Sequence, residues 1–593
     1  MTPTPSETRP SSGSEADAGR PGGAGPGRGS DPAGGPSNAS DGGPSNASAG
    51  GPSNDSDGPA ETVSHAVDDG AGVDAEDVAG TAAAPIEIVV LALVAAVLGI
   101  GMRFVTRSPL WLDEALSVNI AQLPPGEIVQ ALRQDGHPPL YYLLLHGWTA
   151  AFGTSDAAVR SLSAVIGIAS LPLAWLVGRR RGGPLLAWIL VAVVALSPYA
   201  VRYSTETRMY SMVITLVLAG YLLVDDVVRR GRDGVGRLVG LALVAGALLL
   251  SHYWSLWLLG SLGIVLLVTW RRSSDPARRR GAGRAVLALV AGGILLFAWW
   301  LPAMLYQSAH TGTPWASADR PTVSVSAALA DFAAGAIPDA PMIVIASTLV
   351  FALGVFGVAV DRRHIQLDVR TARRFRVEVV VLVLTFGVGL AINIVSRSAF
   401  QSRYGAVFFP FYALVVAGGL LCFRSRPIRA GVLAGLLVLY SVAVVFNGFI
   451  TQRSQSRSAA EAIRAEASPG DVVVVCPDQL GPSFSRELGD DFTYVVYPRG
   501  GTPQRVDWVD YAKRNADSAD PARVQAFADD VLRTAGDRGI AVIWSGTYKT
   551  LDGQCEQLLG DLGAVRPGRG IVDSQPEKYY EPANVTWYPP VRR

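Results

Sequence analysis

Hydrophobic residues gather into long runs between residues 86 and 449, separated by short polar or arginine-rich stretches. Most runs come close to the ~20 apolar residues with which an α-helix crosses the hydrocarbon layer of a membrane. The pattern therefore predicts a bundle of transmembrane helices. The runs are residues 86–105, 138–152, 157–178, 184–202, 208–224, 237–251, 253–270, 285–305, 341–360, 377–396, 404–423 and 428–449.

Arginine clusters between these runs set the expected orientation, because cytoplasmic loops carry an excess of Lys and Arg. All the clusters fall on one face if the shortest run, residues 138–152, enters the membrane without crossing it. Eleven spans, a cytoplasmic N-terminus and an external C-terminal segment then follow. The clusters are Arg179–Arg181, Arg229–Arg232, Arg271–Arg280, Arg362–Arg376 and Arg424–Arg429.

The two ends of the chain differ from the apolar middle. Residues 1–83 contain mostly Gly, Pro, Ser, Ala, Asn and Asp with a repeated GGPSNAS motif, and we expect a disordered cytoplasmic tail because they cannot bury enough apolar surface to fold. The first apolar run lacks a basic region before it, so we interpret it as an uncleaved membrane span and not as a signal peptide. It is then the first span of a transmembrane domain that covers residues 84–451.

Residues 452–593 have the composition of a soluble domain. Residues 458–467 have a helical pattern, and three short runs rich in β-branched and aromatic residues predict strands that alternate with helices. We therefore expect a small extracytoplasmic α/β domain. The predicted strands are residues 471–476, 492–497 and 540–544.

Composition supports a polytopic membrane protein. The chain has 593 residues, 49% of them hydrophobic, and a mean hydropathy of +0.28. The arginines form separate clusters and no single stripe, which argues against nucleic-acid binding. Three cysteines show no metal-ligand spacing, and Cys476 and Cys555 are the pair that could form a disulfide if their segment lies outside the cell.

The stretch from Ser108 to Trp148 concentrates polar residues directly after the first apolar run. Asp113 and Glu114 stand there side by side, and carboxylates at the mouth of a membrane bundle are costly unless they are hydrated, paired or used. One interpretation is structural: Asp113 caps a short helix that begins at Ala115, with Glu114 in its first turn. The other is that the pair performs chemistry.

Four motifs in order over residues 86–211 carry a family resemblance: PLWLDEALS, DGHPPLYYLLLHGW, AAVRSLSAVIGIASLPLAWLVGRR and ALSPYAVRYSTETRMYS. Together with a weaker SRYGAVFFPFYAL, they resemble membrane glycosyltransferases of the GT-C fold, most closely the branch of the protein O-mannosyltransferases and the lipid A aminoarabinose transferase. The resemblance implies an α-helical GT-C-like bundle of about 11–12 transmembrane helices, with the small α/β domain at its C-terminus. It also implies a polyprenyl-phosphate-linked sugar as donor.

The resemblance assigns roles to particular residues. It implies that Asp113 is the catalytic base, with Glu114 as its partner, and a carboxylate within hydrogen-bond reach can take the proton of an attacking hydroxyl. Arg208 and Arg403 are expected to bind the donor phosphate, because a guanidinium fits phosphate oxygens; the structural alternative is that they snorkel at the membrane interface. Expected substrate-binding residues are His137, Tyr141, Glu206, His252 and Tyr253.

Several of these assignments have competing interpretations. Glu206 could pair with Arg208 or contact the acceptor, His137 could be a structural helix-entry residue, and Tyr253 could belong to an interfacial aromatic belt. A divalent cation held by Asp113 with Glu206 or His252 stays open, although the spacing matches no known ligand pattern.

We expect transfer of a mannose-like or arabinose-like sugar to an external hydroxyl at the plasma membrane. The acceptor could be a protein, a glycolipid or a wall polymer. The alternative is a transporter or flippase of lipid-linked sugars, which should show internal repeats and polar, broken helices at the membrane midplane; neither is found in the sequence. A scaffold or sensor that presents the C-terminal domain is the third hypothesis.

Overall fold

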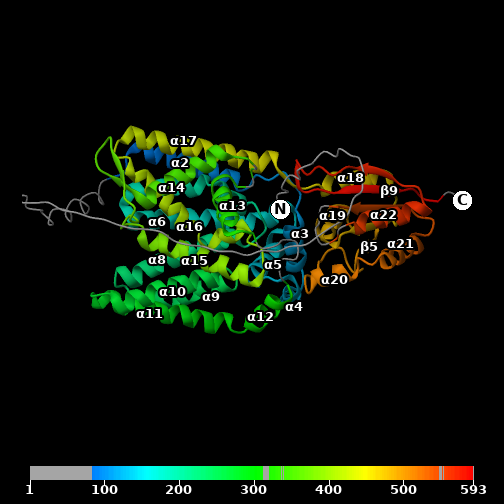
Figure 1. Ribbon diagram of the computed structural model, residues 1–593, viewed down its shortest axis with the longest axis horizontal. Coiled ribbons are helices and arrows are strands. Elements are labelled where there is room, and N and C mark those ends of the chain that lie inside the picture. The colour runs from blue at the N-terminus through cyan, green and yellow to red at the C-terminus, as the bar shows by residue number, and fades with distance from the viewer. Residues whose placement is uncertain are drawn as a thin grey trace, which may run out of the picture. The chain divides into compact units, whose positions relative to one another are not determined.

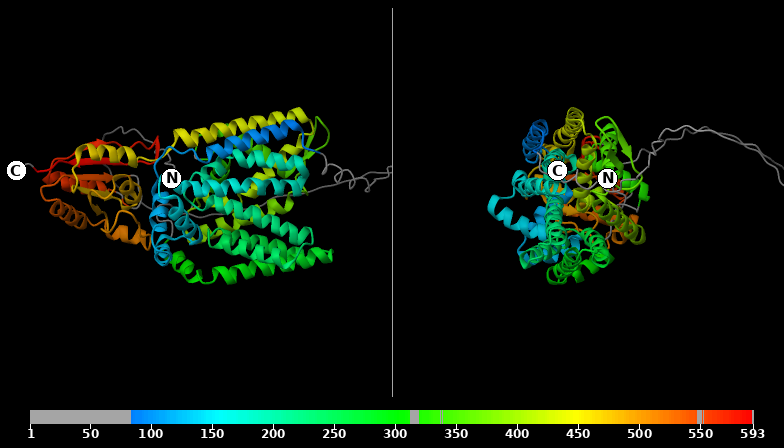
Figure 2. Two further views of the ribbon diagram at one scale, coloured as in Figure 1. Left: turned by 180° about the vertical axis from the view of Figure 1, so that it is seen from behind. Right: turned by 90° about the vertical axis from the view of Figure 1, so that its left-hand side faces the viewer.

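The chain folds into a helical bundle followed by an α/β region (Figures 1 and 2). Most of the expected disordered tail lies outside the residues described. The computed structural model describes residues 83–311, 319–335, 337, 339–546, 551 and 553–591.

The bundle is built from apolar helices that correspond to the hydrophobic runs. Its long helices are α2 (Ile86–Met102), α6 (Asp156–Leu196), α8 (Tyr210–Val224), α9 (Val235–Leu249), α10 (Ser255–Arg272), α11 (Pro276–Gly292), α14 (Pro341–Phe356), α15 (Arg376–Ser396), α16 (Phe409–Gly419) and α17 (Arg426–Val445). Shorter helices are α3 (Leu112–Ala121), α4 (Pro125–Asp135), α5 (Leu140–Phe152), α7 (Pro198–Ser204), α12 (Leu301–His310) and α13 (Pro321–Ala334). Irregular turns η1 (Asp225–Arg229), η2 (Gly293–Phe297), η3 (Ser402–Val407), η4 (Leu420–Cys422) and η5 (Phe446–Ile450) extend or join them, and β1 (Gly357–Ala359) and β2 (Ile365–Leu367) form a small hairpin.

Helix α6 consists of two helical segments, which we call its legs, separated by a break. Its 41 residues are interrupted at Gly182 and Gly183, and Gly183 has φ 72°. Glycine adopts this left-handed conformation without steric cost, and Pro184 follows it directly. The break lies between the two predicted spans 157–178 and 184–202, so the expected reversal of the chain is present.

The apolar helical segments of the bundle equal the predicted spans in number. Among the described residues, six helices are long and apolar enough to cross a membrane, and four more apolar helices are shorter. With α6 counted as its two legs, they make eleven. Helix α5 has 13 residues and would be about 20 Å long, shorter than the ~30 Å hydrocarbon layer.

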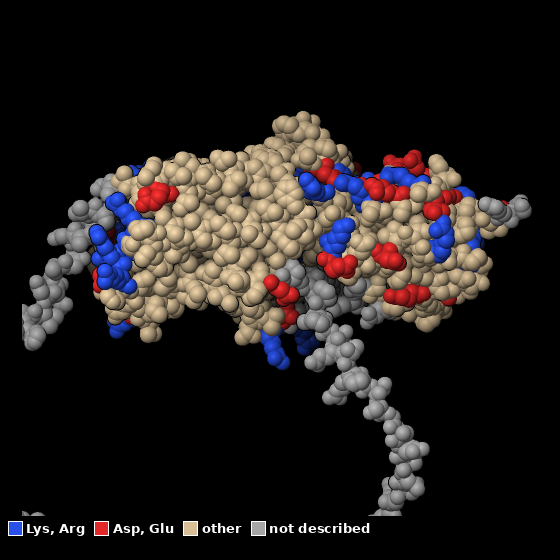
Figure 3. Space-filling view, turned by 90° about the horizontal axis from the view of Figure 1, so that it is seen from above, with Lys and Arg blue, Asp and Glu red and all other residues tan. Residues whose placement is uncertain are grey.

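Charged residues are absent from a broad band of the surface. Figure 3 shows this uncharged band on one face, with basic residues gathered at the end of the bundle away from the α/β region. A lipid-facing surface has this pattern, because charged side chains are costly in hydrocarbon. The chain is therefore a multi-pass membrane protein.

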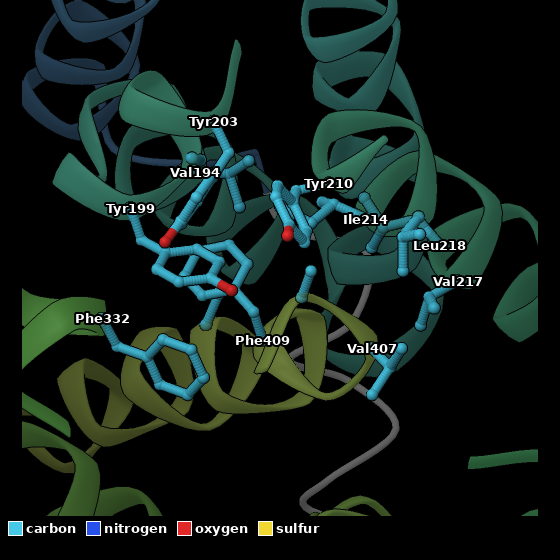
Figure 4. Packing of buried hydrophobic residues seen from close by; sticks show 14 of the residues in the cluster. Val194, Tyr199, Tyr203, Tyr210, Ile214, Val217, Leu218, Phe332, Val407 and Phe409 are labelled. Carbon is cyan, nitrogen blue, oxygen red and sulfur yellow. The ribbon is translucent and has the colours of Figure 1, made fainter. Parts of the chain in front are cut away.

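An aromatic cluster lies inside the bundle where α7, α13 and α16 meet (Figure 4). The rings of Tyr199 and Phe409 stack with centroids 4.8 Å apart, and Phe332 meets Tyr199 edge-on at the same distance. The hydroxyl of Tyr199 donates a hydrogen bond to the backbone oxygen of Arg403 at 3.0 Å. This packing therefore supports η3, the turn that carries Arg403.

The α/β region contains a five-stranded sheet in the order β5-β4-β6-β9-β7, with β4, β5 and β6 parallel. In β4, Val472 and Val474 pack on one face of the sheet and Val473 and Val475 on the other, so both faces are covered and the whole strand is buried. The strands are β3 (Gln452–Ser454), β4 (Val472–Cys476), β5 (Thr493–Val496), β6 (Ile540–Trp544), β7 (Arg569–Val572), β8 (Tyr579–Glu581) and β9 (Asn584–Tyr588). The helices are α18 (Ser456–Glu466), α19 (Gly481–Leu488), α20 (Tyr511–Asp517), α21 (Pro521–Ala535) and α22 (Gln554–Val565), with the short turn η6 (Asp478–Leu480).

The three predicted strands and the predicted helix of this region are present, and Cys476 and Cys555 form the expected disulfide. Strands β7 and β9, which add antiparallel partners beyond β6, were not predicted. The sheet is therefore larger than the sequence pattern indicated.

Candidate active site

Asp113 lies between two arginines that come from distant parts of the chain. Its Oδ2 atom is 3.1 Å from Nη1 of Arg403 and 3.7 Å from Nη2 of Arg208. The Asp113 side chain keeps 16% of its surface exposed, so it is not fully enclosed by the protein. The structure thus brings together the three residues to which the sequence assigned proton transfer and phosphate binding.

The helix that carries Asp113 starts earlier than expected. Helix α3 begins at Leu112, and not at Ala115, and its N-cap is Trp111 with no side-chain cap. Asp113 is therefore the second residue of the helix, and its carboxylate faces the arginines. The capping interpretation of Asp113 does not fit this geometry.

Arg208 is fixed by a chain of hydrogen bonds. Its Nη2 atom is 2.8 Å from Nε2 of His137, and the other ring nitrogen of His137, Nδ1, is 2.9 Å from Oδ2 of Asp135. An arginine only donates hydrogen bonds, so Nε2 of His137 must be the acceptor. Nδ1 then carries the ring proton and donates a hydrogen bond to Asp135. His137 therefore orients Arg208, and Ser117 accepts a further bond from Arg208 at 3.2 Å.

Glu114 has surroundings opposite to those of Asp113. It is fully buried and receives two hydrogen bonds from Arg160, at 2.8 and 2.6 Å, and one from the backbone N–H of Thr207 at 3.0 Å. Arg453 lies 3.2 Å away. Burial on its own raises the pKa of Glu114, but the charges of Arg160 and Arg453 outweigh it and hold the pKa below its usual value. Since Glu114 has no exposed surface, its position does not fit direct contact with a substrate.

Glu206 lies in the turn before Arg208 and is 2% exposed. Its Oε1 atom is buried without a hydrogen-bond partner among the described residues, and no ion pair with Arg208 is found among them. Burial raises the pKa of Glu206, the charges of Arg453 and Arg202 oppose this, and the charge of Glu114 adds to it. Of the two alternatives for Glu206, the ion pair with Arg208 is not formed among the described residues, and its Oε1 atom stays able to accept a hydrogen bond.

His252 lies beside the two arginines, in the turn between α9 and α10. Its ring centroid is 5.7 Å from that of Tyr210 and 5.3 Å from that of Tyr404. Burial lowers the pKa of His252 to about 3, helped by the positive charges of Arg208 and Arg403. The ring is therefore neutral at physiological pH and adds no charge beside Arg208 and Arg403.

Two predicted substrate-binding tyrosines have other partners. Tyr141 is 1% exposed, and its hydroxyl is hydrogen-bonded to Ser163 Oγ at 2.8 Å. The hydroxyl of Tyr253 donates to Gln307 and accepts from Trp300 Nε1 at 3.0 Å. Both hydroxyls are thus used in packing the protein, which does not fit direct contact with a substrate.

Three residues at the site were missed by sequence reasoning: Arg160, Arg453 and Tyr580. Arg160 had a signal, because it is an arginine at the external end of an apolar run, far from the cytoplasmic clusters. Arg453 directly follows the last span, and its role depends on a contact with Glu114 that no local pattern predicts. The ring of Tyr580 meets that of Trp111 edge-on at 5.1 Å, and Arg403 lies over the same Trp111 ring.

The side chains near Asp113 do not fit a metal-binding site. In the part of the chain that the structure describes, no group of three or more His, Cys, Asp and Glu side chains comes together. Asp113, the predicted ligand, already faces two positive guanidinium groups, which would repel a cation. No metal step is therefore derived for this site.

A mainly apolar hollow runs between α8, α9, α10 and α15. Leu248 and Leu258 line one part of it and flank the turn that carries His252, whereas Arg229 and Glu378 line its other end near the basic face. Asp113 is not among its lining residues. The hollow could take an apolar chain whose head lies near the His252 turn.

Comparisons with known proteins agree with the predicted fold. A family model described as dolichyl-phosphate-mannose-protein mannosyltransferase matches residues 136–300, which is less than half of the chain. The structure of ArnT from Cupriavidus metallidurans in the apo state matches with a TM-score of 0.55 at 13% identity, over 84% of this chain and 97% of ArnT. No curated protein sequence matches.

Two further structures match more weakly. ArnT from the same organism bound to undecaprenyl phosphate gives a TM-score of 0.49 at 13% identity, over 84% of this chain and 97% of that chain. The arabinofuranosyltransferase AftD from mycobacteria gives 0.46 at 14% identity, over 84% of this chain and 40% of AftD. The match to apo ArnT shows that this membrane protein has the GT-C glycosyltransferase fold, as predicted from its motifs.

Proposed function

We propose that this protein is a membrane glycosyltransferase that moves a sugar from a polyprenyl-phosphate donor to an external hydroxyl, with Asp113 as general base. The observation that carries the proposal is the position of the partly exposed Asp113 carboxylate between Arg403 and Arg208. A base and two phosphate-binding groups are then adjacent, as transfer from a phosphate leaving group requires.

The chemistry balances with these residues alone. The acceptor hydroxyl gives its proton to the Asp113 carboxylate while its oxygen attacks the anomeric carbon of the donor. The bond between that carbon and the phosphate oxygen breaks, and the electron pair leaves with the polyprenyl phosphate. Arg208 and Arg403 stabilise the charge that develops on the phosphate, so no general acid is needed.

The arginines are held in place before the donor arrives. His137 and Ser117 orient Arg208, and Tyr199 fixes the backbone of Arg403. Groups that need little rearrangement during the reaction contribute most to stabilising its transition state. The apolar hollow beside the His252 turn supports a donor with a long hydrocarbon tail.

The orientation in the membrane follows from charge and from the disulfide. Basic clusters at the end of the bundle away from the α/β region favour a cytoplasmic position for that end. The Cys476–Cys555 disulfide favours an oxidising, extracytoplasmic compartment for the α/β region. We therefore propose that Asp113 and the C-terminal region face outward and that the N-terminus is cytoplasmic.

The sugar and the acceptor are proposed only by class. The donor sugar is mannose-like or arabinose-like, and the acceptor is a protein, glycolipid or wall polymer with a free hydroxyl. A transporter of lipid-linked sugars would need polar groups along a path through the membrane, whereas Asp113, Arg208 and Arg403 cluster at one end of the bundle.

The test is an incubation of membranes that contain the protein with labelled polyprenyl-phosphate hexoses and pentoses. Covalent transfer of label to an acceptor supports the proposal, and movement of intact lipid across the membrane without transfer contradicts it. Asp275→Asn is a suitable control, because Asp275 caps α11 through a 2.9 Å bond from Ala277 N–H and asparagine caps equally well. We expect this variant to transfer label like the wild type.

A further inference from the structure

A short element of the α/β region lies against the segments that carry the candidate active-site residues. Strands β3 and β8 pair in parallel, and Gln452 and Ser454 lie opposite Tyr579 and Glu581. β3 directly follows the last membrane helix, whereas β8 comes from near the end of the chain. This pair lies against the start of α3, the helix that carries Asp113.

Glu581 makes the central contact. Its Oε1 atom accepts a hydrogen bond of 3.1 Å from the backbone N–H of Leu112, the first residue of α3. The N–H groups of the first helical turn have no partner within the helix, and Trp111 at the N-cap supplies no side-chain acceptor. Glu581 thus caps α3 from a position 469 residues further along the chain.

The same element also holds the segments on either side. Arg453 donates from its backbone N–H to Ser108 Oγ at 2.6 Å and from its side chain to Thr205 O at 2.7 Å. Thr205 belongs to the turn that carries Arg208. The β3–β8 pair therefore contacts both of the segments that place the base and one phosphate-binding arginine.

A second contact fixes the same end of the helix. Trp111 and Leu112 form a buried apolar cluster with Val506, Trp508 and Tyr511 of the α/β region. This packing orients the helix but satisfies no N–H group, so the hydrogen bond to Glu581 is a separate constraint.

We propose that Glu581 is a positioning residue for the transfer reaction, which holds the start of α3 so that Asp113 meets the acceptor hydroxyl. This rests on the proposed function. Glu581 itself is 3% exposed and touches Leu112, not the substrate, so it acts through the helix. The α/β region is then a part of the catalytic unit and not an independent appendage.

Burial of a carboxyl group costs free energy unless it is hydrogen-bonded, so its position needs a reason. The first N–H groups of a helix have no partner within the helix, and a buried carboxyl oxygen that accepts a hydrogen bond from one of them satisfies both groups. Loss of the Glu581 Oε1 atom would leave the Leu112 N–H without a hydrogen-bond partner and let the first turn of α3 shift. A displacement of about 1 Å at a reacting group can lower a rate by about a hundredfold.

The experiment compares Glu581→Ala, Glu581→Gln and Glu577→Ala in the full-length protein. Glutamine keeps an oxygen that can accept from Leu112 N–H, and Glu577 is an exposed glutamate four residues away. Transfer from the labelled donor that the wild type uses is measured with kcat and KM separated, and hydrogen exchange is followed for the peptide that covers residues 110–121.

We expect Glu581→Ala to lower kcat about tenfold, to leave the donor KM within about twofold, and to speed exchange at the start of α3. Glu581→Gln should restore most of kcat and protection, and Glu577→Ala should match the wild type. Unchanged kcat in Glu581→Ala, or a loss in Glu581→Gln equal to that in Glu581→Ala, would overturn the proposal. A wild type without any transfer would instead refute the proposed function, while the exchange data would still test the contact.

Discussion

The two sides of helix α3 hold neighbouring carboxylates in opposite surroundings. Asp113 faces a partly open site and two arginines at 3.1 and 3.7 Å, whereas Glu114 is enclosed by Arg160, Arg453 and the N–H of Thr207. One side of the helix is therefore available for chemistry and the other fastens the helix to the bundle. Adjacent residues of the same charge type can thus have separate roles, because burial and partners decide what each can do.

The largest effect is expected from Asp113→Asn. Asparagine keeps the shape but accepts no proton, and general bases contribute roughly 10²–10⁴-fold to rates. We expect kcat to fall about a thousandfold while the thermal unfolding midpoint stays close to that of the wild type. Loss of folded protein in this variant would show that Asp113, like Glu114, is needed for stability.

Glu114→Gln should affect stability. Breaking a buried ion pair by removing one charge costs about 3–5 kcal/mol, because Arg160 is left buried without its counter-charge. We expect a marked drop in the midpoint of thermal or denaturant unfolding in detergent. A stable Glu114→Gln protein that has lost transfer would show that the two carboxylates do act together.

Arg403→Lys should have a smaller effect on transfer. Lysine keeps the positive charge but loses the planar fork that binds two phosphate oxygens. We expect about a tenfold loss of kcat/KM for the donor, and a weaker affinity for polyprenyl phosphate measured by isothermal calorimetry. The control is Arg284→Lys, since Arg284 pairs with Asp233 at the basic end of the bundle; equal losses in both variants would remove the special role of Arg403.

The pH dependence of stability gives an effect that is spread over several pH units. Burial raises the pKa of Glu581 to about 8, although hydrogen bonds from Ser454, Ser483 and the Leu112 N–H lower it, and the nearby charge of Asp113 raises it. Because the folded pKa is above the unfolded one, stability is fully present below the unfolded pKa near 4.5 and is lost as pH rises through about 8.

The slope from this group is at most about 1.4 kcal/mol per pH unit. In Glu581→Gln the unfolding midpoint should change less with pH over this window than in the wild type. The Glu577→Ala variant should keep the wild-type pH dependence. An identical pH profile in Glu581→Gln would show that the carboxyl group titrates near its ordinary pKa.

Local patterns were enough to predict most of the fold. Apolar runs of nearly constant length gave the helical legs, the Gly182–Gly183–Pro184 sequence separates the two legs of α6, and the buried run Val472–Cys476 forms the central strand β4. Strands β7 and β9 were missed because neither has a long apolar run: β7 is half exposed and β9 alternates.

The active site was predictable only in part. The WLDEALS motif and the external helix ends indicated Asp113, Arg208 and Arg403, which the structure brings together. The different role of Glu114 depends on Arg160 and Arg453, and the role of Glu581 depends on a contact across 469 residues. Such contacts are set by tertiary packing, and one sequence contains no local signal for them.

The most direct test of the central claim is the rate of a single turnover with purified protein preloaded with the labelled donor. Preloading removes donor binding from the measurement, so that only proton removal and sugar transfer are compared between the wild type and Asp113→Asn. Slowing by about a thousandfold with donor still bound is the result predicted for a general base. Transfer by Asp113→Asn at the wild-type rate would contradict the account.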